Sequence, residues 1–244
     1  MPLPPNRRCP MNARLKLLAF AFVSFSGAAH AGFITTGGID GGNNGELSSL
    51  SGACTVNFNS GNAVNACGAT YTGASASNFP TGTTTSHATP AGDTTAYFTV
   101  GPSDGGPVAI SLSQQANYFG FFTGSLDSYN LVQFYLNDVM VDAFTGTQIN
   151  EVAFPGAATV GDQSKSAYVN YFPTAGETQV FFDRVVYSSG SNAFETDNHT
   201  FGQASPEQLG SVPEPGVVAL LGIAGLAFLA SRRRQRNATA SQIG

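Results

Sequence analysis

Short apolar or alternating runs, separated by turn residues, occupy the chain after Thr95. Nine such runs are AYFTV, VAISLS, YFGFF, LVQFYL, VMVDAF, INEVAF, SAYVNYF, TQVFFDRVVYSS and AFETDN. Turn signals such as GPSDGGP, ND and PTAGE separate them, and no 3.6-residue hydrophobic period lies between them. Runs of this length and spacing favour strands, and many in succession favour an antiparallel β-sandwich. We therefore predict one all-β domain over residues 32–209.

The clearest local prediction is a hairpin in which Leu131–Leu136 returns as Val139–Phe144, with Val132, Phe134 and Leu136 on one face. Asn137 and Asp138 supply a two-residue turn, because both residue types tolerate positive φ. Before these runs, residues 32–93 are rich in Gly, Ser, Thr and Asn. We expect that part to form long loops or edge meanders rather than core.

The N-terminus has the three parts of a secretory leader. From Met11, the expected true start, Arg14 and Lys16 form a basic region, residues 17–25 an apolar one, and Ala29-His30-Ala31 a cleavage site. Residues 1–31 are therefore predicted to be a signal peptide.

Charge is scarce and unevenly placed. Charged residues make up 10% of the chain, and residues 32–209 hold fourteen acidic side chains against Lys165 and Arg184, a formal charge of −12. Such a body repels phosphate backbones, so we expect no nucleic-acid partner.

Cleavage of the leader removes Cys9 and leaves Cys54 and Cys67 in an oxidising compartment. The residues between them suggest two short strands around a turn at Ser60 and Gly61, which a disulfide could staple. A metal site or a redox pair is the alternative, although both normally need closer spacing or nearby histidines.

Three motifs suggest chemistry. GPSDG at 101–105 matches a nucleophile elbow at Ser103, with His199 as a base, but a strand-like run follows where a helix is needed, so a turn is favoured. DGGNNGE at 40–46 resembles a calcium loop but lacks the EF-hand ligand pattern. Glu195 and Asp197 face one side of a predicted strand, where they could bind Ca²⁺ or act as acid and base.

The C-terminus combines an apolar run with a basic end. Residues 216–230 carry no charge, and as a helix they would span about 22 Å, short of the roughly 30 Å hydrocarbon core of a membrane. Arg232, Arg233 and Arg234 place this end, with the tail 237–244, on the cytoplasmic side. Upstream, Pro213 and Pro215 hold the backbone extended, as a membrane protease would require.

This tail resembles the PEP-CTERM sorting signal, over residues 210–236. The motif is Val212, Pro213, Glu214 and Pro215, followed by the short transmembrane run at 216–230 and the arginines at 232–236. The resemblance implies transient insertion in the inner membrane, recognition and cleavage by an exosortase, and delivery to the cell surface or extracellular matrix.

The body is similar to a family of exosortase-dependent surface proteins with a jelly-roll-like sandwich. The family's Trp-Gly-Ser, Asp, Tyr-Asn signature maps onto Gly124, Ser125, Asp127, Tyr129 and Asn130, with Thr123 in the place of the tryptophan.

We therefore expect a non-catalytic surface or exopolysaccharide-matrix protein without a cofactor, a structural Ca²⁺ ion being left open. One alternative is a carbohydrate-binding module in which Asp127, Tyr129 and Asn130 hold exopolysaccharide. The other is a glycan hydrolase in which Glu195 or Asp197 works with a further carboxylate.

Overall fold

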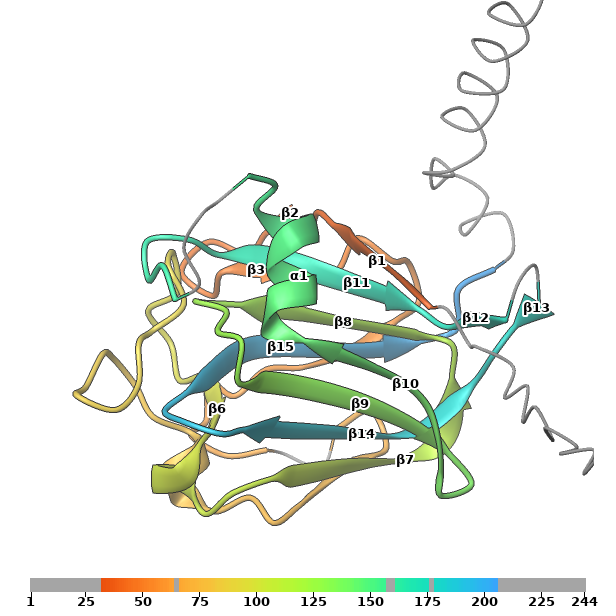
Figure 1. Cartoon of the computed structure of the whole chain (residues 1–244), viewed down its shortest axis with the longest axis horizontal. Helices are drawn as coiled ribbons and strands as arrows, with labels where there is room; N and C mark the ends of the chain where they lie inside the picture. The colour runs from red at the N-terminus through yellow and green to blue at the C-terminus, as the bar shows by residue number, and fades with distance from the viewer. Residues whose placement is uncertain (1–31, 64–65, 157–160, 176–177, 206–244) are drawn as a thin grey trace, which may run out of the picture.

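The computed structural model describes residues 32–63, 66–156, 161–175 and 178–205, which form two packed antiparallel sheets (Figure 1). In hydrogen-bonded order, the first sheet has β1 (Phe33–Thr36), β11 (Ala167–Phe172), β8 (Tyr118–Thr123), β15 (Phe194–Gly202) and β4 (Cys54–Val56), and β6 (Phe98–Val100) also pairs with β15. The second sheet has β10 (Val139–Thr145), β9 (Asn130–Leu136), β14 (Phe182–Ser189), β7 (Val108–Ala116) and β5 (Ala69–Thr72). The predicted antiparallel β-sandwich is confirmed.

The remaining elements are small. Two short hairpins lie outside the two sheets: β2 (Ile39–Asp40) with β3 (Glu46–Leu47), and β12 (Thr174–Ala175) with β13 (Thr178–Gln179). The described helical segments are the 3-10 turns η1 (Ala76–Asn78) and η2 (Pro102–Asp104) and the helix α1 (Gly146–Ala153).

Aromatic rings fill the space between the sheets. The Phe119 ring on β8 lies 5.8 Å from that of Phe134 on β9 and 6.2 Å from that of Tyr187 on β14, between centroids. All three side chains are fully buried. Aromatic pairs at such separations contribute roughly 0.5–1.5 kcal/mol beyond the area they bury. The core therefore depends on cross-sheet ring contacts as well as on burial.

The outer face of the first sheet is covered too, because every residue of β8 is buried. The turn between β2 and β3 supplies part of this cover. A side chain at Gly45 would collide with the ring of Phe122, and Ser48 Oγ lies 2.6 Å from the Tyr118 hydroxyl oxygen. Polar residues on this face of β15 are therefore shielded from water.

Eight of the nine predicted strand runs contain strands, and the exception is INEVAF, which lies largely in α1. Thr145 caps this helix: its Oγ1 accepts from the Gln148 backbone N–H at 3.3 Å, while Gln148 Oε1 accepts from the Thr145 N–H at 2.9 Å. This capping box and the burial of Ile149 favour a helix over an extended strand. The prediction for this run was wrong.

Residues 32–93 contribute more to the fold than the sequence predicted. β1, β4 and β5 are edge strands, as expected of an edge meander. However, Val56, Phe58 and Phe79 belong to the main core, which contradicts the expectation of loops without core residues. The Phe58 ring lies 5.5 Å from the rings of Phe79 and of Phe98 on β6, so a few large side chains join this segment to the core.

Cys54 and Cys67 form the predicted disulfide, with their Cα atoms 5.5 Å apart. The predicted hairpin around Ser60 and Gly61 is wrong: β4 pairs with β15, and the described residues between the cysteines contain no second strand. Cys67 lies just before β5, which belongs to the other sheet. The disulfide therefore links the two sheets.

Replacing Cys54 and Cys67 together with serine should lower the free energy of unfolding by about 3 kcal/mol, because the unfolded chain regains the freedom of an open loop. Urea unfolding of the purified protein, followed by tyrosine fluorescence, measures the change. Reducing the wild type should reproduce it, and an unchanged midpoint in both cases would contradict the stabilising role.

The predicted Asn137-Asp138 turn is confirmed, since both residues have positive φ, 49° and 64°, and Val139 pairs with Leu136. Of the three residues predicted to share one face of this strand, Val132 and Phe134 lie in the core, whereas Leu136 at the end of the strand is only half-buried. Asp138 also forms an ion pair with Arg184 at 2.7 Å.

The predicted signal peptide at 1–31 and the predicted membrane run at 216–230 lie outside the described residues. Within the described ranges, no helix has the length and hydrophobicity needed to span a membrane.

Candidate functional site

A polar pocket of about 290 Å³ lies at the end of the sandwich where β8 ends and β9 and β15 begin. Its walls come from segments that are distant in the sequence: residues 84–88, Ser125, Asp127 and Tyr129 of the β8–β9 loop, Gly161, Gln163, and Asn192, Ala193 and Glu195 around the start of β15. The predicted ligand residues Asp127 and Tyr129 thus meet the predicted carboxylate Glu195.

Glu195 is the most deeply buried carboxyl of the pocket, with only 2% of the residue exposed. Its Oε1 accepts a hydrogen bond from the Ala88 N–H at 2.8 Å, whereas Oε2 has no partner among the described residues. Burial raises the pKa of Glu195 to about 7; the Ala88 amide opposes this, and the charges of Asp127 and Asp104 add to it. The pocket therefore contains an incompletely paired carboxyl.

Tyr129 presents the exposed aromatic ring of this pocket, with 37% of the residue accessible. Its hydroxyl donates to the Asn192 carbonyl at 3.3 Å. Partial burial, followed by interaction with Asp127, raises the pKa of Tyr129 to about 12, so its hydroxyl stays protonated at neutral pH. The pocket thus offers an aromatic ring beside carboxylate and amide groups.

Asn130 lies behind the pocket rather than in its wall. It is fully buried, and its Oδ1 accepts from the Asp127 N–H while its Nδ2 donates to the Ser189 hydroxyl and the Ala193 carbonyl, each at 3.1 Å. A side chain at Gly146 would collide with the Asp127 carbonyl, so α1 packs closely against the same loop. Asn130 therefore positions the loop that carries Asp127 and Tyr129.

Asp197 lies outside the pocket although it is only two residues beyond Glu195. It is fully buried beside Asp93. Burial, and then the charge of Asp93, raise the pKa of Asp197 to about 8, while the Asn198 N–H opposes the shift. Glu195 and Asp197 point to one side of β15, as the alternation indicated, but they have different neighbours.

Ser103 occupies the turn η2, and β7 rather than a helix follows it. Its Oγ lies 3.4 Å from His87 Nε2, but the same nitrogen is 2.8 Å from Asp104 Oδ1. A catalytic triad uses the two different ring nitrogens of its histidine for the nucleophile and the acid. The Ser103, His87 and Asp104 side chains therefore form a polar network at the turn and lack the triad arrangement.

His199, the other histidine of the predicted domain, belongs to the core. Its ring stacks on Tyr187 with centroids 5.1 Å apart, and its nitrogens lie 3.0 Å from the Tyr71 hydroxyl and 2.8 Å from Thr196 Oγ1. Burial lowers the pKa of His199 to about 3, so the ring is neutral. This neutral, fully bonded ring is a structural residue.

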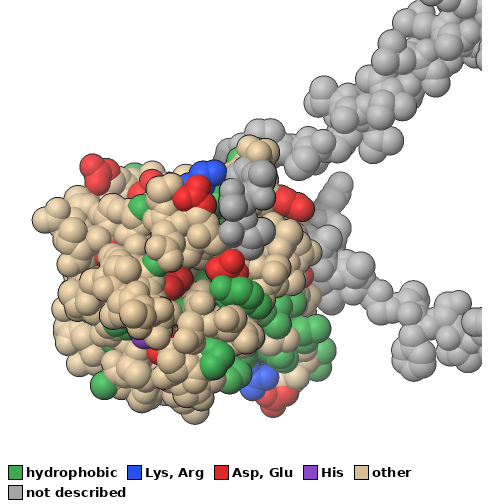
Figure 2. Space-filling view, turned by 60° about the vertical axis from the view of Figure 1, so that its left-hand side comes forward, with side chains coloured by type: hydrophobic (Ala, Val, Ile, Leu, Met, Phe, Trp, Pro, Cys, Tyr) green, Lys and Arg blue, Asp and Glu red, His purple; other side chains and the backbone are tan. Residues whose placement is uncertain are grey.

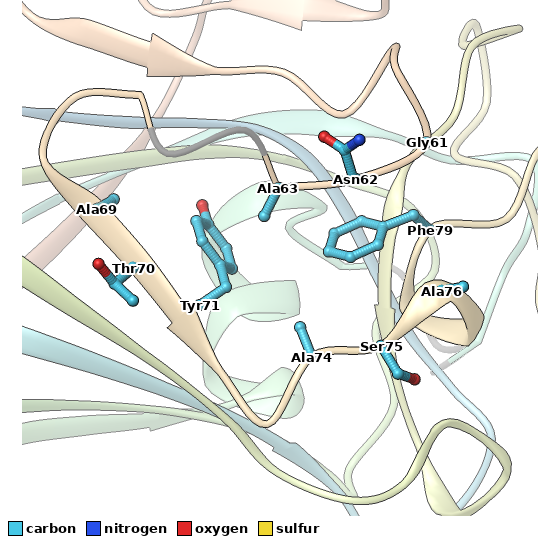
Figure 3. Close-up of a pocket in the computed structure, with 10 residues that line it drawn as sticks. All are labelled: Gly61, Asn62, Ala63, Ala69, Thr70, Tyr71, Ala74, Ser75, Ala76 and Phe79. Carbon is cyan, nitrogen blue, oxygen red and sulfur yellow. The ribbon is translucent and has the colours of Figure 1, made fainter.

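A second hollow, of about 390 Å³, lies beside β5 (Figure 3). The side chains of Ala63, Tyr71, Ala74 and Phe79 point into it. Its described lining residues include no charged side chain, and the Tyr71 hydroxyl is engaged with His199. The polar pocket therefore offers the richer chemistry.

Basic side chains are few on the described surface, as Figure 2 shows for one face. Lys165 lies 3.8 Å from Asp162, and Arg184 pairs with Asp138. Neither basic residue lines the polar pocket. The pocket is therefore acidic in character.

The fold and the pocket define an all-β sandwich protein with an acidic, hydroxyl-rich site at one end. Residues 211–234 match the family model of the PEP-CTERM protein-sorting motif, so the chain carries this motif, which implies export and an exosortase as processing partner. The match includes Val212 to Pro215 and Arg232 to Arg234, which lie outside the described residues. No match was found among curated proteins or among solved structures.

Proposed function

We propose that the protein is a non-catalytic component of the cell surface or extracellular matrix that binds polysaccharide in its polar pocket. Sorting by an exosortase brings the body to the compartment where such polymers lie. The observation that supports binding is the meeting of Asp127, Tyr129 and Glu195 in one pocket.

The groups around this pocket suit a sugar ring. Hydroxyl groups of a sugar can bond to the carboxylates and to the Asn192 amide, while its C–H face can pack on the Tyr129 ring. The volume of about 290 Å³ lies at the lower end of the roughly 300–1,000 Å³ found for small-molecule sites. The pocket is therefore suited to one or two sugar units of a longer chain.

Charge narrows the ligand class further. Asp127 and Glu195 line the pocket without a Lys or Arg beside them, and the predicted domain carries a formal charge of −12. Acidic sugars such as uronic acids would be repelled. We expect neutral sugars or amino sugars to bind.

Separate Asp127→Ala and Tyr129→Ala variants should each weaken binding to the native matrix polysaccharide at least about tenfold, a loss of roughly 1.4 kcal/mol. Each removes a group that lines the pocket, and a pull-down with increasing polysaccharide gives the affinity. Asp138→Ala and Tyr135→Ala, which change the same residue types outside the pocket, serve as matched controls. Equal retention of the pocket variants and the controls would exclude this site.

The same incubation distinguishes binding from hydrolysis. A non-catalytic protein releases no reducing ends from the polysaccharide. Release by the wild type that is lost in Glu195→Gln would instead favour a glycan hydrolase, with the Glu195 and Asp127 carboxyls as the acid and its partner.

A further inference from the structure

A second polar cluster lies under the segments that cover the outer face of the first sheet. Asn44 comes from the β2–β3 turn, Asp93 and Thr95 from the segment before β6, and Asp197 and Asn198 from β15. The register of β15 with β8 shifts between Asp197 and Thr200, so Asp197 and Asn198 lie at a β-bulge. Three segments far apart in the sequence thus converge on one buried point.

Two carboxyl groups at this point each have one oxygen without a partner. Asp93 is 6% exposed and Asp197 is fully buried, and Oδ2 of each has no hydrogen-bond partner in the described part of the chain. The side chain of Asp93 interacts with that of Asp197 and disfavours its ionised form. The two buried carboxyl groups therefore lie close to each other, and each has one unpaired oxygen.

A chain of hydrogen-bonded neutral groups connects Asp93 with the residue that follows Asp197. The Thr95 hydroxyl oxygen lies 2.7 Å from Asp93 Oδ1 and 3.0 Å from Asn44 Oδ1. The Asn44 amide in turn donates to Asn198 Oδ1 at 2.7 Å. Carboxylate, amide and hydroxyl oxygens are the donors that Ca²⁺ accepts in flexible geometry, whereas zinc favours nitrogen and sulfur.

Among the residues that the structure describes, no positively charged side chain pairs with these two carboxyl groups. Lys165 and Arg184 pair with Asp162 and Asp138, and the described histidines bond to other groups. Burying ionised carboxylates without a counter-ion is strongly unfavourable. No three His, Cys, Asp or Glu side chains of the described residues form a metal-binding group, so any cation site here depends on two carboxylates with neutral oxygens.

From these contacts we propose that Asp93 and Asp197 bind one Ca²⁺ ion. The ion holds the β2–β3 hairpin and the segment before β6 against β15. The same segment continues back to residues 84–88, which form a wall of the polar pocket. The site is independent of the proposed polysaccharide binding, because neither aspartate lines that pocket.

Metal titration of the full chain tests this proposal. The purified protein is freed of metal with EDTA, dialysed, and titrated with CaCl₂, with MgCl₂ as the comparison. We expect calorimetry to show one Ca²⁺ site per chain. A Ca²⁺ concentration of about one hundred times the Kd should raise Tm by about 5–10 °C.

Isosteric variants locate the ion. Asp93→Asn and Asp197→Asn each remove one charged ligand and should abolish both the calorimetric signal and the Ca²⁺-dependent rise in Tm. Asp138→Asn, the same change at an exposed turn, should retain both. Binding that persists in the two site variants would overturn the proposal.

A terbium measurement on the wild type keeps the proposal testable if a variant does not fold. The chain has no tryptophan, so emission from bound Tb³⁺ must be sensitised by tyrosine. Tyr71 and Tyr97 interact electrostatically with Asp197 and Asp93, respectively. We expect Tb³⁺ emission that CaCl₂ displaces. If no Tb³⁺ emission appears and CaCl₂ leaves Tm unchanged, Asp93 and Asp197 share a proton instead of binding an ion.

Discussion

Replacing Pro213, Glu214 and Pro215 together with alanine is expected to abolish delivery of the protein to the cell exterior. These residues form the centre of the PEP-CTERM motif that matches residues 211–234. Without the prolines the segment can continue as a helix, and it loses the local preference for the extended backbone that the sequence predicts and that suits a membrane protease. Immunoblots of membrane, surface and medium fractions should show the variant retained in the membrane as the longer form.

A matched control changes Glu207 and Gln208 to alanine, just upstream of the matched residues. This control should reach the exterior like the wild type. If the triple variant does the same, with the same apparent mass, the motif does not direct sorting.

Replacing Phe119 with alanine should lower the free energy of unfolding by about 3–5 kcal/mol. The ring is fully buried and contacts five other rings, those of Phe121, Phe134, Tyr187, His199 and Phe201. Removing it leaves a cavity between the sheets that rigid neighbours cannot fill. Urea unfolding with the disulfide intact measures the loss.

The control for this core variant is Phe33→Ala. Phe33 is half-buried on the edge strand β1 and stacks on Phe172 in the smaller cluster. The Phe33→Ala variant should lower the free energy of unfolding by about 1–2 kcal/mol, because fewer contacts are removed and water can reach the site. Equal losses at the two positions would contradict the central place of Phe119 in the core.

Local patterns predicted most of the strands because the relevant forces act over a few residues. Alternation identified the inward positions of Val132 and Phe134, and positive-φ residue types identified the turn at 137–138. The helix α1 could also have been predicted, because Thr145 and Gln148 have the spacing of a capping box. The β-rich composition instead favoured a strand for this run.

The candidate site was only partly predictable because long-range contacts assemble it. Asp127, Tyr129 and Glu195 were recognised by residue type, but nothing in the sequence indicated that Asn130 would be buried. No site role was predicted for His87, Asp93 or Asp104. His87 and Asp93 lie in the Gly/Ser/Thr-rich segment 32–93, which has no hydrophobic period, and Asp104 lies in the turn motif at 101–105. Ala88, for example, meets Glu195 across 107 residues of chain.

Sorting of this protein by its C-terminal signal is tested most directly by mass spectrometry of the mature protein from its native host. Exosortase processing predicts a C-terminus close to Val212–Pro215, with residues 216–244 removed. A mature exported chain that still ends at Gly244 would contradict it.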